Sequence, residues 1–248
     1  MNVQLFVPCF IDQLYPQTAA NAIKVLEFAG CRVRYNPFQT CCGQPAFNSG
    51  FWDEAKTVAS KFINDFTTDE PVISLSGSCK GMVLNYYNDL FTNTLQHNKC
   101  RTIQSNMFEL SEFLVNKIHF FDFGAKLAAR AVYHDSCGAL RECGIRQEPR
   151  ELLRMVQGLD LVEAQDSEVC CGFGGTFAVK FEAISTAMAQ QKIDNALALG
   201  AEYILSVDTS CLMHIQGYID KHNLPLKTMH LADVLATNLQ DAYRAVEH

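Results

Sequence analysis

Residues 170–175 of the chain read CCGFGG, and residues 41–46 read CCGQPA. In both stretches two adjacent cysteines precede a glycine, and the flanking sequence falls into register when the two pairs are aligned. Upstream, VQLFVPC ends at Cys9 and RAVYHDSC ends at Cys137. The chain is therefore a tandem repeat with a period of about 122 to 132 residues, which indicates a duplicated domain because it is too long for a solenoid unit.

Each half alternates short apolar runs with amphipathic patterns. In the first half the helical pattern TAANAIKVLEFAG precedes the strand-like run CRVRYN, and in the second half EPRELLRMVQGLD precedes LDLVEAQ. Such alternation predicts an α/β fold with two tandem Rossmann-like domains, each with a mostly parallel sheet. We place the domains at residues 1–124 and 125–248, with the boundary inside FFDFGAKLAAR.

Composition limits the partners and the compartment. The chain has 248 residues, of which 48% are hydrophobic and 19% charged, and its net charge of −7 includes basic residues that are scattered singly. This pattern argues against nucleic-acid or anionic-membrane binding, and no stretch approaches the ~18 apolar residues of a membrane span. The N-terminal MNVQLFVPCFIDQLYP lacks the basic start of a signal peptide, so we expect a cytoplasmic protein without membrane insertion.

The cysteines indicate metal or redox chemistry. Eleven are more than packing requires, and thiols in a reducing cytoplasm do not form a disulfide framework. Eight recur in both halves, spaced C-x31-CC-x36-C and C-x32-CC-x39-C. We expect each set of four to meet at the carboxyl ends of the strands of its sheet, where ligands of such folds bind. The predicted metal ligands are Cys9, Cys41, Cys42, Cys79, Cys137, Cys170, Cys171 and Cys211.

Adjacent cysteines favour a cluster over a single ion. Two neighbouring thiolates reach one tetrahedral ion with difficulty, which weakens a structural zinc site but leaves it as an alternative. In a cluster the two can bind different irons, and four cysteines satisfy a [4Fe–4S] centre, so we predict one or two such clusters per chain. Glycines permit positive φ and the close approach of N–H groups to an anionic cluster. The predicted cofactor-binding glycines are Gly43, Gly172, Gly174 and Gly175.

The other cysteines and nearby polar residues have ordinary explanations. We expect Cys31 and Cys100 to be small core residues, and we favour the same for Cys143 because the first half has no counterpart. Two histidines and two lysines near the motifs have two interpretations, interaction with a cluster or an ordinary polar or surface role. For the histidines we favour the ordinary role. These residues are His134, His214, Lys80 and Lys180.

The doubled motif resembles the cysteine-rich CCG domains found in one component of heterodisulfide reductase and in the iron–sulfur component of glycolate oxidase. Over most of its length the chain resembles, more narrowly, the LutA/YkgE family, through GCRVRYNPFQTCCGQPAFNSG, AVYHDSC, CCGFGGTFAVK, SCLMHIQG and MHLADVL. This resemblance implies an iron–sulfur electron-transfer subunit of an NAD-independent L-lactate dehydrogenase. It would act with an iron–sulfur or ferredoxin-like companion and a third subunit to oxidise L-lactate to pyruvate.

One departure from the broader family concerns the kind of cluster. The CCG-domain component of heterodisulfide reductase ends each motif with CxxC, which implies five cysteines and a non-cubane cluster per site. Here the corresponding positions hold Met82 in SCKGM and His214 in SCLMH. Four thiolates per half fit a cubane more simply, and the missing fifth cysteines count against the alternative of a thiol–disulfide redox protein.

Overall fold

The computed structural model describes residues 1–66 and 69–239, and each half contains a four-stranded sheet whose paired strands are all parallel. The first sheet has the order β2-β1-β3-β4 and the second the order β6-β5-β7-β8, so the two have the same topology. The strands are β1 (Asn2–Phe6), β2 (Arg32–Tyr35), β3 (Val72–Ser74), β4 (Met107–Glu109), β5 (Lys126–Tyr133), β6 (Gln157–Val162), β7 (Tyr203–Ser206) and β8 (Lys227–His230).

The two sheets confirm the predicted α/β architecture with an internal duplication. The domain boundary between residues 124 and 125 stays a prediction, and residues 240–248 of the predicted second domain lie outside the described part of the chain. The helices of the first half are α1 (Cys9–Leu14), α2 (Pro16–Phe28), α3 (Gln44–Asn48), α4 (Trp52–Phe66), α5 (Gly77–Gly81), η1 (Met82–Tyr86), α6 (Tyr87–Phe91), α7 (His97–Asn106), α8 (Leu110–Glu112) and η2 (Phe113–Lys117). Those of the second half are η3 (Gly138–Glu142), α9 (Glu148–Arg154), α10 (Thr176–Lys180), α11 (Glu182–Ala198), α12 (Thr209–His222) and α13 (Leu231–Leu235).

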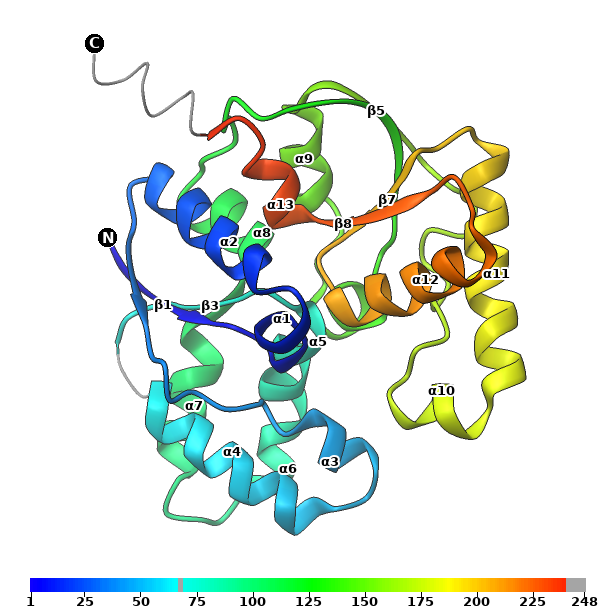
Figure 1. Cartoon of the computed structure of the whole chain (residues 1–248). Coiled ribbons are helices and arrows are strands. Elements are labelled where there is room, and N and C mark those ends of the chain that lie inside the picture. The colour runs from blue at the N-terminus through cyan, green and yellow to red at the C-terminus, as the bar shows by residue number, and fades with distance from the viewer. Residues whose placement is uncertain (67–68, 240–248) are drawn as a thin grey trace.

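The alternation of side chains along each strand divides the interior into three apolar clusters. Leu5 of β1 and Tyr133 of β5 enter a central cluster, which both sheets share with α2, α8, α9 and α13. Phe6 enters an outer cluster with α4, α6 and α7, whereas Val132 enters another with α11 and α12. Figure 1 shows these outer helices on separate sides of the molecule. Because successive strand residues point to opposite faces, neighbouring positions at a strand end belong to different clusters.

The long helix after each cysteine pair has the same buried face in both halves. In α4 the buried positions are Ala55, Ala59, Phe62, Ile63 and Phe66, spaced three or four residues apart as expected for an amphipathic helix. Helix α11 buries the matching positions Ser185, Ala189, Lys192, Ile193 and Ala196. Two of these five residues in the second half are polar where the first half has alanine and phenylalanine.

The helix predicted over residues 148–160 is wrong in its second part. Helix α9 ends at Arg154, and β6 begins at Gln157. Gly158 has a φ of +82°, which a right-handed helix cannot contain, and it lies opposite a register shift in β5. The amide of Gln157 donates to the carbonyl of Ala125 instead of continuing the helix.

The two halves touch backbone to backbone where α5 packs against η3, a contact called the seam below. A methyl group at Gly77 would lie 2.5 Å from Cβ of Ala139, and one at Gly138 would lie 2.5 Å from Cα of Ser78. Since real side-chain atoms do not approach this closely, only glycine allows the observed separation of the halves at these positions.

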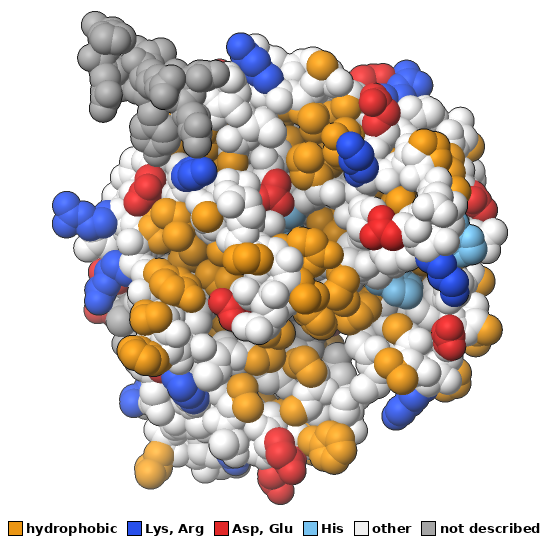
Figure 2. All heavy atoms as spheres, viewed as in Figure 1, with side chains coloured by type: hydrophobic (Ala, Val, Ile, Leu, Met, Phe, Trp, Pro, Cys, Tyr) orange, Lys and Arg blue, Asp and Glu red, His pale blue; other side chains and the backbone are white. Residues whose placement is uncertain are grey.

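The surface carries mixed side chains. On the face in Figure 2, lysines and arginines lie singly between acidic and apolar groups. Within the described residues, no helix combines the length and apolar character needed to cross a bilayer.

Candidate metal centres

The structure brings the four repeated cysteines of the first half together. Cys9 begins α1 after β1, Cys41 and Cys42 lie in the loop before α3, and Cys79 lies in α5 after β3. The sulfurs of Cys9 and Cys41 are 3.8 Å apart. Cys42 contacts both Cys41 and Cys79, so the four thiols form one continuous group at the carboxyl end of the sheet.

The second half repeats this arrangement. Cys137 follows β5, Cys170 and Cys171 lie in the loop before α10, and Cys211 lies in the first turn of α12 after β7. The thiol of Cys170 hydrogen-bonds with those of Cys137 and Cys171, and Cys171 also contacts Cys211. Residues far apart in the sequence therefore converge in both halves, because parallel strands end at the same edge of a sheet.

Two of the four predicted glycines contact the thiols. The amides of Gly43 and Gly172 donate to Sγ of Cys41 and Cys170, each at 3.4 Å. Their φ values are +88° and +93°, a conformation that side chains disfavour. Gly174 and Gly175 are exposed and lie farther along the loop, at the start of α10.

The substitution Gly172→Ala is expected to destabilise the protein by about 3 kcal/mol through positive φ and a clash. Its Cβ would lie 2.6 Å from the carbonyl oxygen of Ser185. Gly50 is a matched control, because its φ is +85° and a Cβ there would meet nothing within 4 Å. Gly50→Ala should cost only about 1 kcal/mol. Urea unfolding of both variants measures the difference, and equal losses would rule out the clash.

The pKa values of the thiols show that neighbouring thiolates are unfavourable unless a cation compensates their charge. In the second set, hydrogen bonds with Cys170 and Cys211 raise the pKa of Cys171, and burial raises it further. Hydrogen bonds from Cys137 and Cys171 lower the pKa of Cys170. In the first set, contact with a neighbouring thiol and then burial raise the pKa of Cys9. Four thiolates in contact repel one another, and a metal centre removes this penalty. The donor sets therefore fit a thiolate-bound metal or cluster.

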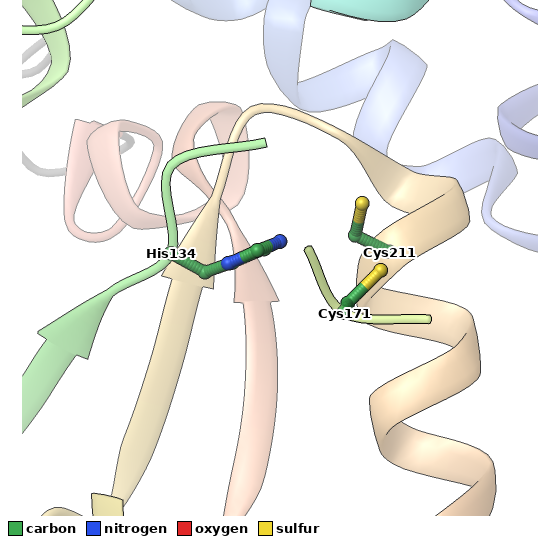
Figure 3. Close-up of side chains that lie close together, drawn as sticks. All are labelled: His134, Cys171 and Cys211. Atoms are coloured by element: carbon green, nitrogen blue, oxygen red, sulfur yellow. The ribbon is translucent and has the colours of Figure 1, made fainter. Parts of the chain in front are cut away.

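His134 lies beside the second set. Its ring nitrogens are buried and have no hydrogen-bond partner within the described residues. One of its ligand atoms and the sulfurs of Cys171 and Cys211 all lie within 4.8 Å of one another, and Figure 3 shows the ring extending from its strand end toward both cysteines. Burial lowers the pKa of His134 to about 3, so the ring is neutral. The backbone of Ser167 is close enough to the ring to raise this pKa slightly. Both nitrogens nevertheless remain without a well-placed partner, which fits a site whose bound group completes their hydrogen bonding, and the ordinary polar role stays a prediction.

The remaining cysteines lie outside both sets. Cys31 is buried in the central cluster and Cys100 in the outer cluster of the first half. Cys143 packs against the central cluster, and its thiol donates to the carbonyl of Gly77 at 3.4 Å. All three have the structural surroundings expected of them.

The other polar residues near the motifs contact protein groups or solvent. Nε2 of His214 lies 3.1 Å from Oγ of Ser185. Lys80 is buried, and its ammonium lies 2.5 Å from the carboxylate of Glu112. Lys180 is exposed in the last turn of α10.

Asp208 joins the loops of both sets, although it is not among the predicted site residues. Its buried carboxylate accepts hydrogen bonds from the hydroxyls of Ser76 at 2.6 Å and Ser136 at 2.7 Å. It also accepts from the amide of Ser78 at 3.0 Å and from its hydroxyl at 2.9 Å. All four residues lie within three positions of a repeated cysteine. The sequence does distinguish this residue: residues 76–79 read SGSC and residues 208–211 read DTSC, so the second half has aspartate where the first has serine.

An aromatic pair connects the two sets. Phe10 follows Cys9 in α1, and Phe173 lies two residues after Cys171. Their rings meet edge to face with centroids 5.6 Å apart. The two groups of thiols thus belong to one continuous region of the molecule.

Comparisons with known proteins agree with this geometry. The cysteine-rich CCG domain family matches residues 3–84 and 131–216. Lactate utilization protein A 2 of Bacillus cereus (strain AH820) is 39% identical over 240 residues, covering 96% of this chain and 99% of its own length. Lactate utilization protein A of Halalkalibacterium halodurans is 41% identical over 235 residues, covering 95% and 96%.

Among solved structures, a hypothetical protein from Helicobacter pylori shares the fold, with a TM-score of 0.57 and 13% identity. The similarity covers 94% of this chain and 48% of that one. At this identity it supports the fold alone. The two matches to the family model and the full-length relatives carry the assignment, and the chain belongs to the lactate utilization protein A family of cysteine-rich CCG-domain proteins.

Proposed function

We propose that this chain is the iron–sulfur electron-transfer subunit of a cytoplasmic multi-protein system that oxidises L-lactate to pyruvate. The names of its full-length relatives support the role in lactate utilisation. The observation that carries the electron-transfer role is the convergence of four thiols in each half at the carboxyl ends of the strands. A companion iron–sulfur or ferredoxin-like protein and a third subunit complete the proposed system.

Each set of cysteines would hold one [4Fe–4S] cluster, which supplies one-electron transfer when bound. In the first set the ligands would be Cys9, Cys41, Cys42 and Cys79, and in the second Cys137, Cys170, Cys171 and Cys211. The amides of Gly43 and Gly172 already donate to a sulfur in each set, and such hydrogen bonds stabilise negative charge on the ligands.

Cluster binding is tested by anaerobic purification with iron and acid-labile sulfide analysis. We expect about four irons and four sulfides per filled site. Cys42→Ser and Cys171→Ser should each remove the contents of one site, because each replaces a buried thiol inside one set. Cys31→Ala is the matched control, since Cys31 is also buried but packs in the central cluster. Zinc in place of iron, or equal iron in all variants, would overturn the proposal.

The electron-transfer role has its own test. Lactate should reduce the cluster-loaded protein only when both companions are present, as followed by the EPR signal of the reduced centres. Lactate oxidation by the isolated chain would contradict a subunit that only carries electrons. Turnover of a disulfide substrate by the isolated chain would instead indicate a thiol–disulfide redox protein.

A further inference from the structure

The internal repeat allows the surroundings of the two sets to be compared position by position. Leu5 pairs with Ile73 in the first sheet, and Tyr133 pairs with Leu205 in the second. The residue that follows Leu5, like the residue that follows Tyr133, points toward the cysteines of its own half. That residue is phenylalanine in the first half and His134 in the second.

The long helices match in the same way. The carbonyl of Ala55 faces Gly43 of the first set, and the carbonyl of Ser185 faces Gly172 of the second. Seven residues after Ala55, α4 has Phe62, and seven residues after Ser185, α11 has Lys192. The second half therefore has a histidine and a lysine where the first has two phenylalanines.

Aromatic rings line the first set. Phe6 meets Phe62 edge to face at 4.9 Å and Phe66 at 5.7 Å. These rings are buried in the same apolar cluster as Cys42 and Cys79. At these positions the first set has no group that donates a hydrogen bond or carries charge.

Polar groups line the second set. Lys192 is 5% exposed and lies within electrostatic range of His134, Cys171 and Cys211. Its ammonium donates to the carbonyl of Asp166 at 2.5 Å and lies 3.7 Å from the carboxylate of the same residue. This carboxylate offsets part of the ammonium charge.

Charge and hydrogen bonding decide which of two clusters of one type is reduced more easily. Reduction adds one electron to an already anionic centre, and no bond forms or breaks. A nearby cation and an N–H donor stabilise the added charge, whereas an apolar shell does not. An imidazole ring always offers at least one N–H, and a ring nitrogen of His134 lies within 4.8 Å of the sulfurs of Cys171 and Cys211.

We propose that the His134 and Lys192 pair makes the second cysteine set the more readily reduced of the two centres. The proposal rests on the proposed function, because it concerns clusters held by both sets. His134 supplies the N–H donor and Lys192 the positive charge. Both act as tuning residues, since the predicted ligands are the cysteines.

An anaerobic redox titration followed by EPR, with dithionite as reductant, tests the order of reduction. Cys42→Ser and Cys171→Ser assign each signal to a half. In the wild type, the signal that Cys171→Ser removes should appear first. His134→Phe and Lys192→Met should each lower the ratio of reduced to oxidised second centre at fixed potential about tenfold, which is about 59 mV for one electron. The first centre should not change.

Conservative variants separate tuning from folding. His134→Gln keeps an N–H donor and Lys192→Arg keeps the charge, so both should retain most of the wild-type ratio. Lys180→Met is the control, because Lys180 is exposed on α10 and carries the same charge. If Lys192→Met loses its iron, the two His134 variants decide the question.

The possible failures can be told apart by iron content. A wild type without iron in either site would overturn the proposed function itself. A wild type with both sites filled whose first centre is reduced first would overturn only the inference. The same holds if His134→Phe retains its iron but shifts the second centre no more than Lys180→Met does.

Discussion

Asp208→Ala is expected to lower the free energy of unfolding by about 4 kcal/mol, because it leaves several buried donors without their charged acceptor. Asp208 is 1% exposed, and its carboxylate accepts four hydrogen bonds from Ser76, Ser78 and Ser136. Urea unfolding measures the loss. Asp220→Ala is the matched control, since Asp220 is exposed on α12 and should change stability by less than about 0.5 kcal/mol.

The same substitution should disturb both metal centres. Ser76 and Ser78 precede Cys79, whereas Ser136 precedes Cys137. Iron analysis of Asp208→Ala should therefore show loss from both halves, unlike a cysteine variant, which empties one. Asp208→Asn should cost less than alanine, because its amide oxygen still accepts while its NH₂ faces the hydroxyls. Full stability and iron content in the alanine variant would show that the four hydrogen bonds contribute little.

Arg150→Met is expected to cost about 3 to 5 kcal/mol, because it leaves Asp135 as a buried charge without a partner. The guanidinium holds both carboxylate oxygens of Asp135, at 2.8 and 2.7 Å, and also binds Glu163. The side chain of Asp135 is 1% exposed. Denaturant unfolding is the measurement.

Two further variants test the origin of this loss. Arg146→Met removes an exposed pair with Glu168 and should cost less than about 1 kcal/mol. In the double variant Arg150→Met/Asp135→Leu the unpaired charge is gone, so part of the stability should return. No recovery in the double variant would show that Arg150 stabilises through packing, such as its contact with the ring of Tyr133, 4.9 Å away.

The fold and the convergence of the cysteines could be predicted because both depend on a pattern repeated in the chain. Strand ends with matching cysteines fix the register, and parallel strands bring their carboxyl ends to one edge. The extent of the helix before β6 could not be predicted, because its end depends on the positive φ of Gly158 in a sheet formed with another segment.

The polar surroundings of the second set were harder to predict. A sequence shows that His134 is a histidine, but it does not show whether other groups reach its nitrogens. Lys192 lies in a helix with several polar residues, so it resembles a surface lysine until its burial is known. Alignment of the two halves places both residues opposite phenylalanines, and this difference is the feature of the sequence that indicates polar surroundings for the second set.

Gly77 and Gly138 allow the two cysteine sets to lie as close together as they do. Because the halves meet through main-chain atoms at the seam, their separation is set by atomic radii and not by a tether. The connection through residues 118–125 also packs into the central cluster, where Phe123 and Ala125 are buried. One added methyl group at either glycine would push the halves apart. The lack of a side chain at these two positions therefore acts together with the central cluster to keep the distance between the sites short.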